Sequence, residues 1–392
     1  MTREVQRGFG GRPPDLVVLG ATGSIGSQTI EVASGLGLRI AALGARSPSA
    51  KLADLAAAHP GARILVAGGA AEERAEFAQR VGRPVEFGAD AVVDGARTPG
   101  AIVVNGIVGA AGLRATVAGL ETGNRVALAN KESLVAGGPV VKKALAEHGG
   151  ELIPVDSEHS ALLQCLAGEP PEAVARLILT ASGGPFRGRS VETLAEVTPA
   201  EALAHPTWDM GDRITIDSAT LFNKGLEVIE AHHLFDVDYD RIAVLVHPQS
   251  VLHSAVEFVD GSWKGHLGHP DMRIPIQYAL TAPERAPSPA RPFDLVGLDL
   301  TFEPPDTESF PAIGLAYAAG REGGSSPAVL NAADEVAVAA FLDRRLGFLG
   351  IAEVVAATLE AAEWRPLETV DDVVDADREG REIAVSLIAG AC

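Results

Sequence analysis

The chain has 392 residues, of which 47% are hydrophobic and only 5% aromatic, and its formal net charge is −20. This length is sufficient for two or three domains. Binding to nucleic acids is driven by clustered Lys and Arg, and anionic membranes repel an acidic protein, so we expect neither partner. A small anionic substrate remains compatible with this composition if the positive charge around it is local.

Two isolated cysteines, Cys165 and Cys392, form neither a disulfide framework nor a metal-binding knuckle, which predicts a reducing compartment. The first fourteen residues are charged and rich in Gly and Pro, without the apolar core of a signal peptide. No run of about 18 apolar residues is present, so no membrane span is expected. These features predict a cytoplasmic protein.

The N-terminal part alternates short apolar runs with helical segments. The run "LVVL" predicts a strand, a Gly-rich turn follows, and residues 27–33 predict a helix. Alternating strands and helices form right-handed βαβ units around a parallel sheet. Further strands are predicted at residues 38–45, 62–68, 101–108, 125–130 and 151–156. We expect an α/β fold that begins with a Rossmann-like domain over residues 1–155.

The rest of the chain predicts three further parts. Residues 156–280 predict an α+β catalytic domain, in which "DRITIDS" (212–218) is expected to be a strand and residues 218–235 one helix. Residues 281–306 are rich in Pro, which suits an extended linker. Apolar residues recur with helical period over 307–392, which predicts a C-terminal helical bundle.

The turn "GATGSIG" places Gly20, Gly23 and Gly26 three apart between a strand and a helix. Glycines let the backbone approach a pyrophosphate, whose charge the helix N-terminus favours. A tight turn without a ligand is the alternative. At the end of the next strand an NAD site usually has an acid, but Arg46 and Ser47 stand there. An Arg at this place suits a 2′-phosphate, which predicts NADP unless Arg46 is merely a surface residue.

Asp156 and Glu158, in "PVDSEH", are two residues apart and would point to the same side of an extended chain. The later segment "LFNKGLEVIEA" offers Glu227 as a third acid, and on an ideal helix it lies about 40° from Asn223. A site made of carboxylates prefers Mg²⁺ or Mn²⁺ to zinc. The alternative is that Asp156 caps the following helix and Glu158 is solvated in its first turn.

A rival zinc site is conceivable because four histidines cluster in sequence, although their spacing matches no common zinc pattern. These are His247, His253, His266 and His269. Lys131, in "ANKES", follows a strand and so lies where open α/β sheets bind ligands, unless it is a surface lysine.

Several segments after residue 180 suit a phosphate. "SGGPFRG" offers the Ser182 hydroxyl and accessible backbone N–H groups. Ser218, Asn223 and Lys224 lie near the start of the helix that carries Glu227, where a phosphate would meet a helix N-terminus. The loop "HPTWDMG" (205–211), with His205 and Trp208, suits a lid that excludes water, unless Trp208 is a core anchor.

These motifs stand in one order along the chain: "GATGSIG", "ANKESLV", "PVDSEH", "SGGPFRG", "HPTWDMG", "DSATLFNKGLEVIEA", "HPQSVLHS" and "PDMRIPI". Together they closely resemble the 1-deoxy-D-xylulose 5-phosphate reductoisomerase family, from about residue 15 to the end of the chain. The resemblance implies an NADPH-dependent enzyme of non-mevalonate isoprenoid biosynthesis that also requires a divalent metal, Mn²⁺ or Mg²⁺, with Co²⁺ as a third option. It would convert a sugar phosphate, 1-deoxy-D-xylulose 5-phosphate, into 2-C-methyl-D-erythritol 4-phosphate, and we expect a homodimer.

The resemblance also implies roles for individual residues. The cofactor residues would be Thr22, Gly23, Ser24, Ile25, Arg46, Ser47, Asn130, Glu132 and Gly211. The metal ligands would be Asp156, Glu158 and Glu227. The substrate would contact Lys131, Ser157, Glu158, Ser182, His205, Ser218, Asn223, Lys224 and Glu227, and Lys131, Glu158 and His205 would be catalytic.

The chain departs from the family pattern at a few places. The turn before Arg46 is one residue shorter, which leaves the 2′-phosphate contacts open, and Phe222, Arg213 and Asp334 replace the common Met, Lys and Asn. Two rival functions remain: an NADP-dependent, metal-assisted oxidoreductase acting on a 2-hydroxy acid, and an NADP-binding sensor. The phosphate-binding set disfavours the first, and the three carboxylates disfavour the second.

Overall fold

The computed structural model describes residues 14–204 and 211–391. The chain divides into two compact units that alternate along the sequence. Unit 1 comprises residues 1–133, 141–160 and 271–292, and unit 2 comprises residues 134–140, 161–270 and 293–392. Because the chain passes between the units several times, neither unit is one continuous segment. The division into four consecutive parts stays a prediction.

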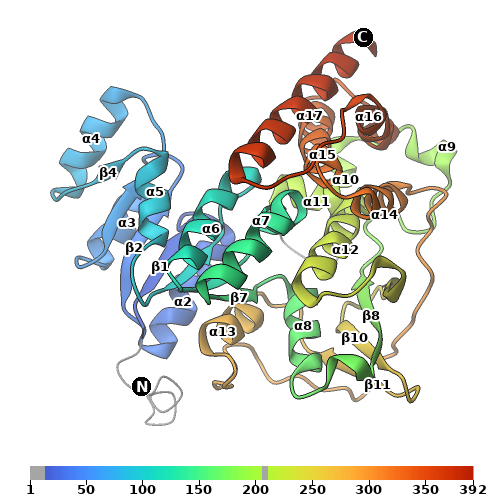
Figure 1. The fold of residues 1–392 in the computed structure, drawn as a ribbon, viewed down its shortest axis with the longest axis horizontal. Helices are drawn as coiled ribbons and strands as arrows, with labels where there is room; N and C mark the ends of the chain where they lie inside the picture. Colours follow the sequence, from blue (N-terminus) through green and yellow to red (C-terminus); the bar gives the residue numbers. More distant parts are fainter. Residues whose placement is uncertain (1–13, 205–210, 392) are drawn as a thin grey trace. The chain divides into compact units, whose positions relative to one another are not determined.

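Unit 1 is built on a seven-stranded parallel sheet in the order β4-β3-β2-β1-β5-β6-β7 (Figure 1). The order reverses beside β1, so the carboxyl ends of β1 and β5 flank a topological switch point, where open α/β sheets bind ligands. The strands are β1 (Leu16–Leu19), β2 (Ile40–Ala45), β3 (Arg63–Val66), β4 (Glu86–Phe87), β5 (Ile102–Asn105), β6 (Arg125–Leu128) and β7 (Glu151–Pro154).

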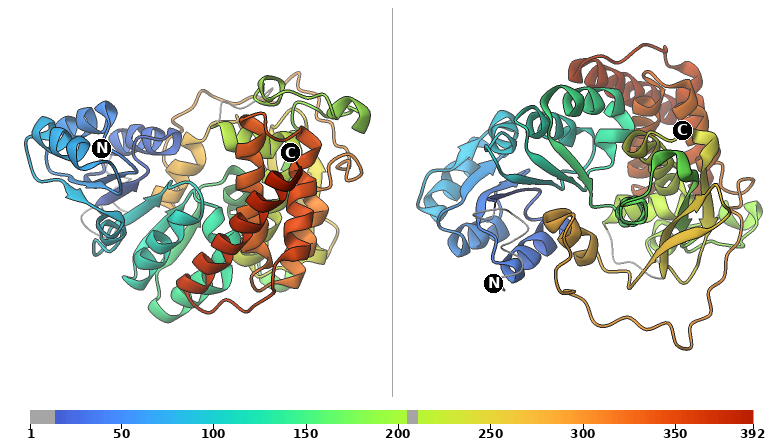
Figure 2. Two further views of the ribbon diagram at one scale, coloured as in Figure 1. Left: turned by 90° about the horizontal axis from the view of Figure 1, so that it is seen from above. Right: turned by 60° about the horizontal axis from the view of Figure 1, so that its bottom comes forward.

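Helices from distant parts of the sequence cover this sheet. The late helix α13 (Arg273–Thr281) packs beside α2 (Ser24–Leu36), and both belong to unit 1 (Figure 2). The core beneath them is almost entirely aliphatic. The other helices of unit 1 are α3 (Ala50–Ala58), α4 (Ala71–Val81), α5 (Ala89–Ala96) and α6 (Leu113–Glu121); α7 (Glu132–His148) and α8 (Ser157–Leu166) have residues in both units.

Unit 2 combines a mixed four-stranded sheet, in the order β11-β10-β8-β9, with a group of helices. The predicted fold class is therefore confirmed: a Rossmann-like parallel sheet, an α+β region and a C-terminal helical region. The strands are β8 (Val174–Ala181), β9 (Ile242–Val246), β10 (Leu252–Phe258) and β11 (Trp263–Leu267). The larger helices are α11 (Asp212–Thr220), α12 (Phe222–Phe235), α14 (Ala312–Glu322), α15 (Ser326–Leu342), α16 (Phe348–Ala361) and α17 (Val370–Ala391).

The prediction of a strand at residues 212–218 is wrong, because this segment is helix α11. Ile214 and Ile216 alternate with polar residues as in a strand, but Gly211 starts a helix that buries Ile216, Ala219 and Thr220 on one face. Tertiary packing here overrides local β propensity. The helix predicted over 218–235 is also broken, since Leu221 has a left-handed φ of 65° and joins α11 to α12.

Close backbone approaches shape the Gly-rich turn of unit 1. A Cβ on Gly20, whose φ is 83°, would lie 2.4 Å from the carbonyl oxygen of Gly106, which follows β5. A Cβ on Gly26 would lie 2.3 Å from the carbonyl oxygen of Gly20. Packing therefore requires the first and third glycines, while Gly23 is the N-cap of α2.

A pair of substitutions within α2 tests this packing. Gly26→Ala should destabilise unit 1 by roughly 1–3 kcal/mol, because the added methyl overpacks the turn. Gly35→Ala is the matched control, since a Cβ there has no neighbour within 4 Å and alanine favours the helix by up to about 1 kcal/mol. The measurement is the melting temperature of both variants, and equal melting temperatures would contradict the packing role of Gly26.

Candidate functional site

Asp156 and Glu158 lie at a strand-to-helix junction of unit 1. Strand β7 ends at Pro154, and α8 begins at Ser157. The two carboxylates are therefore not on one extended segment as predicted, because Glu158 is already in the first turn of a helix. Asp156 Oδ1 accepts the backbone N–H of Glu158 at 3.2 Å, so the predicted capping contact is present. The second oxygen of Asp156 serves another partner.

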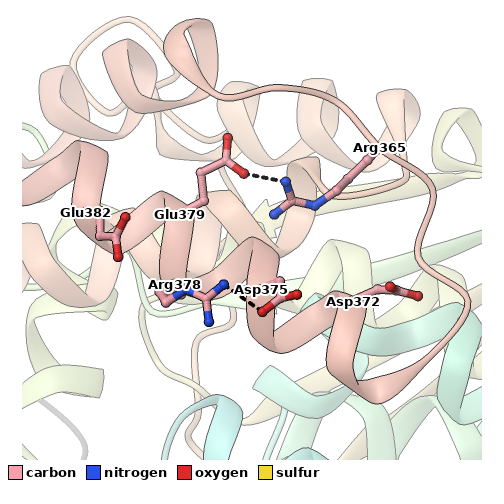
Figure 3. A pocket seen from close by; sticks show the side chains of 6 residues that line it. All are labelled: Arg365, Asp372, Asp375, Arg378, Glu379 and Glu382. Carbon is pink, nitrogen blue, oxygen red and sulfur yellow. Dashed lines mark hydrogen bonds and ion pairs between the residues drawn. The ribbon is translucent and has the colours of Figure 1, made fainter.

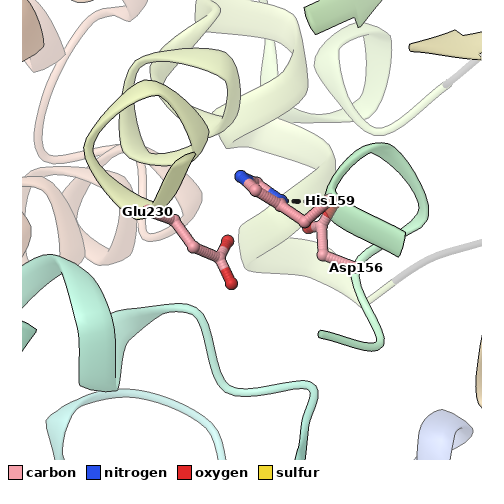
Figure 4. A group of neighbouring side chains, drawn as sticks. All are labelled: Asp156, His159 and Glu230. Carbon is pink, nitrogen blue, oxygen red and sulfur yellow. Dashed lines mark ion pairs between the residues drawn. The ribbon is translucent and has the colours of Figure 1, made fainter. Parts of the chain in front are cut away.

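That partner is Lys131, whose Nζ lies 2.5 Å from Asp156 Oδ2. The Nδ1 of fully buried His159 lies 3.3 Å from Asp156 Oδ1 (Figure 4). Burial alone would raise the pKa of Asp156, but Lys131 and His159 outweigh burial and hold the pKa well below its usual range. Asp156 is therefore an ionised carboxylate at neutral pH, and His159 is one of its neighbours.

Lys131 is not a surface lysine, since only 7% of it is exposed. The turn that precedes it is fixed by Asn130, whose Nδ2 donates to Gly109 O at 2.9 Å and to Glu132 Oε2 at 2.7 Å. On the other side of Asp156, Ser157 Oγ donates to Glu158 Oε2 at 2.5 Å. The ends of β6 and β7 thus gather Lys131, Asp156, Ser157 and Glu158 within unit 1.

The N-terminus of α2 is open to an anion. Its N-cap, Gly23, supplies no side-chain cap, and its first turn holds no acidic residue. The first backbone N–H groups of a helix have no partner within the helix, so they favour a phosphate. The predicted residues Thr22, Gly23, Ser24 and Ile25 form this turn, and Arg46 and Ser47, both exposed, follow β2.

Lys51 is a basic residue at this turn that sequence patterns do not reveal. Its Nζ, in the first turn of α3, lies 2.8 Å from Thr22 O and 2.7 Å from Ser27 Oγ. The sequence places these residues 29 and 24 positions from Lys51, so only the packing of α3 beside the turn brings them together.

In unit 2, the turn after β8 meets the end of α11. Gly184 has a φ of 69°, and a Cβ there would lie 2.8 Å from Ser218 O. The N–H of Gly184 donates to Ser182 Oγ at 3.2 Å. Two of the predicted phosphate-binding segments, around Ser182 and Ser218, are therefore in contact. Helix α12, with Asn223 and Lys224 in its first turn, begins after Leu221.

Glu227 is a buried carboxylate of unit 2 with two donors on its own helix. Asn223 Nδ2 donates to Glu227 Oε1 at 2.6 Å, and Lys224 Nζ donates to Glu227 Oε2. Lys224 and Glu227 are only 4% and 1% exposed. The predicted proximity of Asn223 and Glu227 is confirmed, and Lys224 shares their face of α12. Glu230, one turn further along α12, is also fully buried (Figure 4).

The remaining predicted residues belong to the 205–211 loop and to the rival zinc site. Gly211 is the N-cap of α11 in unit 2, while His205, Trp208 and Met210 lie outside the described residues. Across residues 14–204 and 211–391, none of the four histidines of the rival zinc site joins a group of ligand atoms close enough for one ion. Thus His247 instead contacts Thr301 O at 2.9 Å and stacks on Phe302.

A charged hollow of unit 2 lies on α17 and the segment before it (Figure 3). Arg365 pairs with Glu379 at 2.5 Å, and Arg378 pairs with Asp375 at 2.8 Å. None of the predicted site residues lines this hollow. Its other lining residues are Asp372 and Glu382.

The fold and these groups define a nucleotide-binding α/β protein with buried carboxylates and an anion-binding turn. Three family models match the chain: 1-deoxy-D-xylulose 5-phosphate reductoisomerase over residues 16–138, its C-terminal domain over 152–235, and the DXP reductoisomerase C-terminal domain over 267–383. The chain belongs to the 1-deoxy-D-xylulose 5-phosphate reductoisomerase family.

Individual relatives agree with this membership. The chain is 49% identical to the 1-deoxy-D-xylulose 5-phosphate reductoisomerase of Gloeobacter violaceus, covering 94% of this chain and 95% of the relative. It is also 49% identical to that of Ralstonia nicotianae, over 96% and 98%. Among solved structures, the Zymomonas mobilis enzyme in complex with NADPH is 44% identical, with a TM-score of 0.89 over 96% of this chain and 99% of that one.

A second solved structure, of DOX-P reductoisomerase in complex with NADPH, fosmidomycin and magnesium, is 38% identical, with a TM-score of 0.90 over 96% and 98% of the two chains. Across the part of this chain that the structure describes, no helix combines the length and apolar character needed to cross a bilayer.

Proposed function

We propose that the chain catalyses the NADPH- and divalent-metal-dependent conversion of 1-deoxy-D-xylulose 5-phosphate into 2-C-methyl-D-erythritol 4-phosphate, in non-mevalonate isoprenoid biosynthesis. The observation that carries this proposal is the ionised, largely buried Asp156, which pairs with Lys131 and adjoins Glu158 at the carboxyl edge of the parallel sheet. Family membership supports the same activity, since relatives with nearly half of their residues identical carry this name.

Asp156, Glu158 and Glu227 are the metal ligands in this proposal. All three offer carboxylate oxygens, which suit Mg²⁺ or Mn²⁺ better than zinc. Asp156 fits this role because its pKa is held well below its usual range, so no proton competes with a cation at neutral pH. When bound, the metal supplies Lewis-acid stabilisation of negative charge on substrate oxygens. The magnesium named in a related solved structure supports this choice.

The cofactor residues are those at the switch point of unit 1. The open N-terminus of α2 would bind the pyrophosphate of NADPH, and Arg46 with Ser47 would bind the 2′-phosphate. Asn130 and Glu132 fix the neighbouring turn after β6, and Gly211 of unit 2 is the remaining predicted contact. Bound NADPH supplies the hydride.

The substrate phosphate would lie in the anion-binding part of unit 2. Ser182 and Ser218 supply hydroxyl donors at two backbone segments that touch, and Asn223 and Lys224 supply an amide and a cation. An ammonium has three donors, so Lys224 can bond Glu227 and a phosphate oxygen at the same time. Binding at this remote group can favour assembly of the reacting centre.

Lys131, Glu158 and His205 are the catalytic residues in this proposal. Lys131 and Ser157 would orient the oxygens of the sugar carbons that rearrange, since both adjoin the carboxylates of unit 1. Retro-aldol/aldol and α-ketol rearrangements both agree with this arrangement. We keep the cytoplasmic location as part of the proposal, on the basis of the two isolated cysteines.

An activity assay tests the function. Purified protein should oxidise NADPH when given 1-deoxy-D-xylulose 5-phosphate with Mg²⁺ or Mn²⁺, and chelation of the metal should stop turnover. Glu227→Gln should lower kcat by at least roughly 100-fold while NADPH still binds, because one ligand charge is lost without a change in shape. Absence of turnover with every metal would contradict the proposal, and oxidation of 2-hydroxy acids would favour the rival enzyme.

Cofactor preference tests the role of Arg46. Arg46→Glu should raise the Kd of NADPH by roughly tenfold or more, because a repelling carboxylate replaces the cation expected at the 2′-phosphate. The Kd of NADH, which lacks this phosphate, should change much less. Fluorescence titration with both cofactors measures the two constants, and equal changes would remove Arg46 from the 2′-phosphate site.

We also propose that two copies associate through β11. This strand is an edge of the four-stranded sheet, and its Trp263 and Leu267 are 49% and 38% exposed. An exposed edge strand is a template for pairing with another strand. Sedimentation should give twice the 40.5 kDa mass of one chain, and Trp263→Glu should yield monomers. A monomeric parent protein would contradict the dimer.

A further inference from the structure

A buried charged network in unit 2 connects α11 with the C-terminal helices. Arg213, in the first turn of α11, is its centre: Nη1 lies 2.8 Å from Glu335 Oε1, and Nη2 donates to Asn331 Oδ1 at 2.9 Å and to Asp334 Oδ2 at 3.4 Å. All three partners lie on α15. The network therefore joins two helices that are more than 100 residues apart in sequence.

The network continues within α11 and towards α17. Arg213 Nε lies 3.4 Å from Asp217 Oδ2, one turn later on α11, and Asp217 shares a side-chain hydrogen bond with Asp334. Arg381 of α17 donates to the other oxygen of Glu335 and, at 2.7 Å, to Asp377. Arg213 thus joins α11 directly to α15. Among the described residues, Arg381 bonds Glu335 of α15 and Asp377 of its own helix.

Helix stability does not explain this arginine. A cation in the first turn of a helix opposes the helix dipole. Asp217 and Asp334 are 3% and 0% exposed, and replacing such buried charges by apolar groups is often neutral or stabilising. A role in placing α11 explains them better, because Ser218 directly follows Asp217 and its carbonyl oxygen adjoins Gly184.

We propose that Arg213, with the carboxyl pair Asp217 and Asp334, is a positioning group that sets the affinity of the enzyme for the substrate phosphate by fixing α11, and thereby Ser218, against α15. This inference rests on the proposed function, since it assigns Ser218 to phosphate binding. Arg213 itself does not touch the substrate in this account; it acts through the helix.

The hydrogen bond between two carboxyl groups makes this positioning dependent on a proton. Burial raises the pKa of Asp334 to about 6, although Arg213 opposes the shift. The charged groups that face Asp334 are Arg213 and Asp217 from α11 and Glu335 from α15, with Arg381 and Asp377 of α17 behind Glu335. Among the described residues, α14 and α16 add no charge to this set.

The raised pKa of Asp334 determines how stability changes with pH. Because the folded pKa of Asp334 lies above its unfolded value, its contribution to stability is complete at pH below about 4 and is lost as the pH rises through about 6. Above that pH an ionised Asp334 stands beside Glu335, whose charge opposes its ionisation, and the contact between α11 and α15 weakens. Asparagine at position 334 is neutral at every pH and so never adds this charge.

Steady-state kinetics of the full-length enzyme test the proposal. Arg213→Gln should raise the KM for 1-deoxy-D-xylulose 5-phosphate roughly tenfold, with kcat within about twofold, because substrate and transition state lose the same phosphate contact. Arg381→Gln is the matched control: it removes an equal charge from Glu335 without touching α11, and its KM should equal that of the parent.

Asp334→Asn provides the second test and serves if Arg213→Gln does not fold. The ratio of the parent KM to the Asp334→Asn KM should rise from about 1 at pH 5.5 to above roughly 3 at pH 8, while titration of the substrate phosphate cancels from the ratio. The variant should also melt at a higher temperature than the parent at pH 8 and at the same temperature at pH 5.

Two results would overturn the inference alone: an active parent enzyme whose KM is unchanged by Arg213→Gln, or a KM ratio that stays constant with pH. A parent enzyme that does not turn over 1-deoxy-D-xylulose 5-phosphate refutes the proposed function. That result also refutes the role of Arg213 in substrate affinity. The two failures are therefore distinguishable by the parent assay.

Discussion

Each unit pairs a lysine with a carboxylate that is largely or fully withdrawn from solvent. Lys131 lies against Asp156 in unit 1, and Lys224 donates to Glu227 in unit 2. Removing one partner from a buried pair costs several kcal/mol, whereas an apolar replacement of both is often neutral. Such pairs therefore contribute little net stability. Instead, each lysine keeps its carboxylate ionised within the protein, so that the carboxylate is available to bind a cation.

The scaffold around each pair supplies the required rigidity. In unit 1 the two partners follow neighbouring parallel strands, β6 and β7, so the sheet fixes their separation. In unit 2 they lie three residues apart on one buried helix, where the side chains share a face. The proposed anion-binding parts use the same kinds of element: helix N-termini at α2 and α12 and tight turns after β1 and β8.

Much of this organisation could be predicted from sequence, because it depends on local patterns. Apolar runs and the Gly-rich turn predict the parallel sheet, and the spacing of Asn223 and Glu227 predicts their contact. Other features depend on packing between distant segments. The sequence 212–218 alternates like a strand but folds as α11, and the contact of Lys51 with Thr22 arises only when α3 packs beside the turn.

The partners of Asp156 could also not be predicted from the sequence. Sequence spacing offers a helix cap and a metal ligand as competing roles but does not reveal the two partners that the carboxylate has in the structure. One carboxylate oxygen accepts the N–H of Glu158, and the other faces Lys131. Arg213 and Asp334 likewise give no local signal of their contact, since they are 121 residues apart in sequence.

The proposed function depends most on the binding of one divalent metal ion by Asp156, Glu158 and Glu227. Electron paramagnetic resonance of Mn²⁺ titrated into the protein, without substrate or cofactor, measures this directly. We expect one tight Mn²⁺ per chain, with a Kd that rises at least roughly tenfold in Asp156→Asn and equally in Glu227→Gln. Wild-type Mn²⁺ affinity in Glu227→Gln, together with loss of binding in Asp156→Asn, would contradict the assignment of Glu227 as a metal ligand.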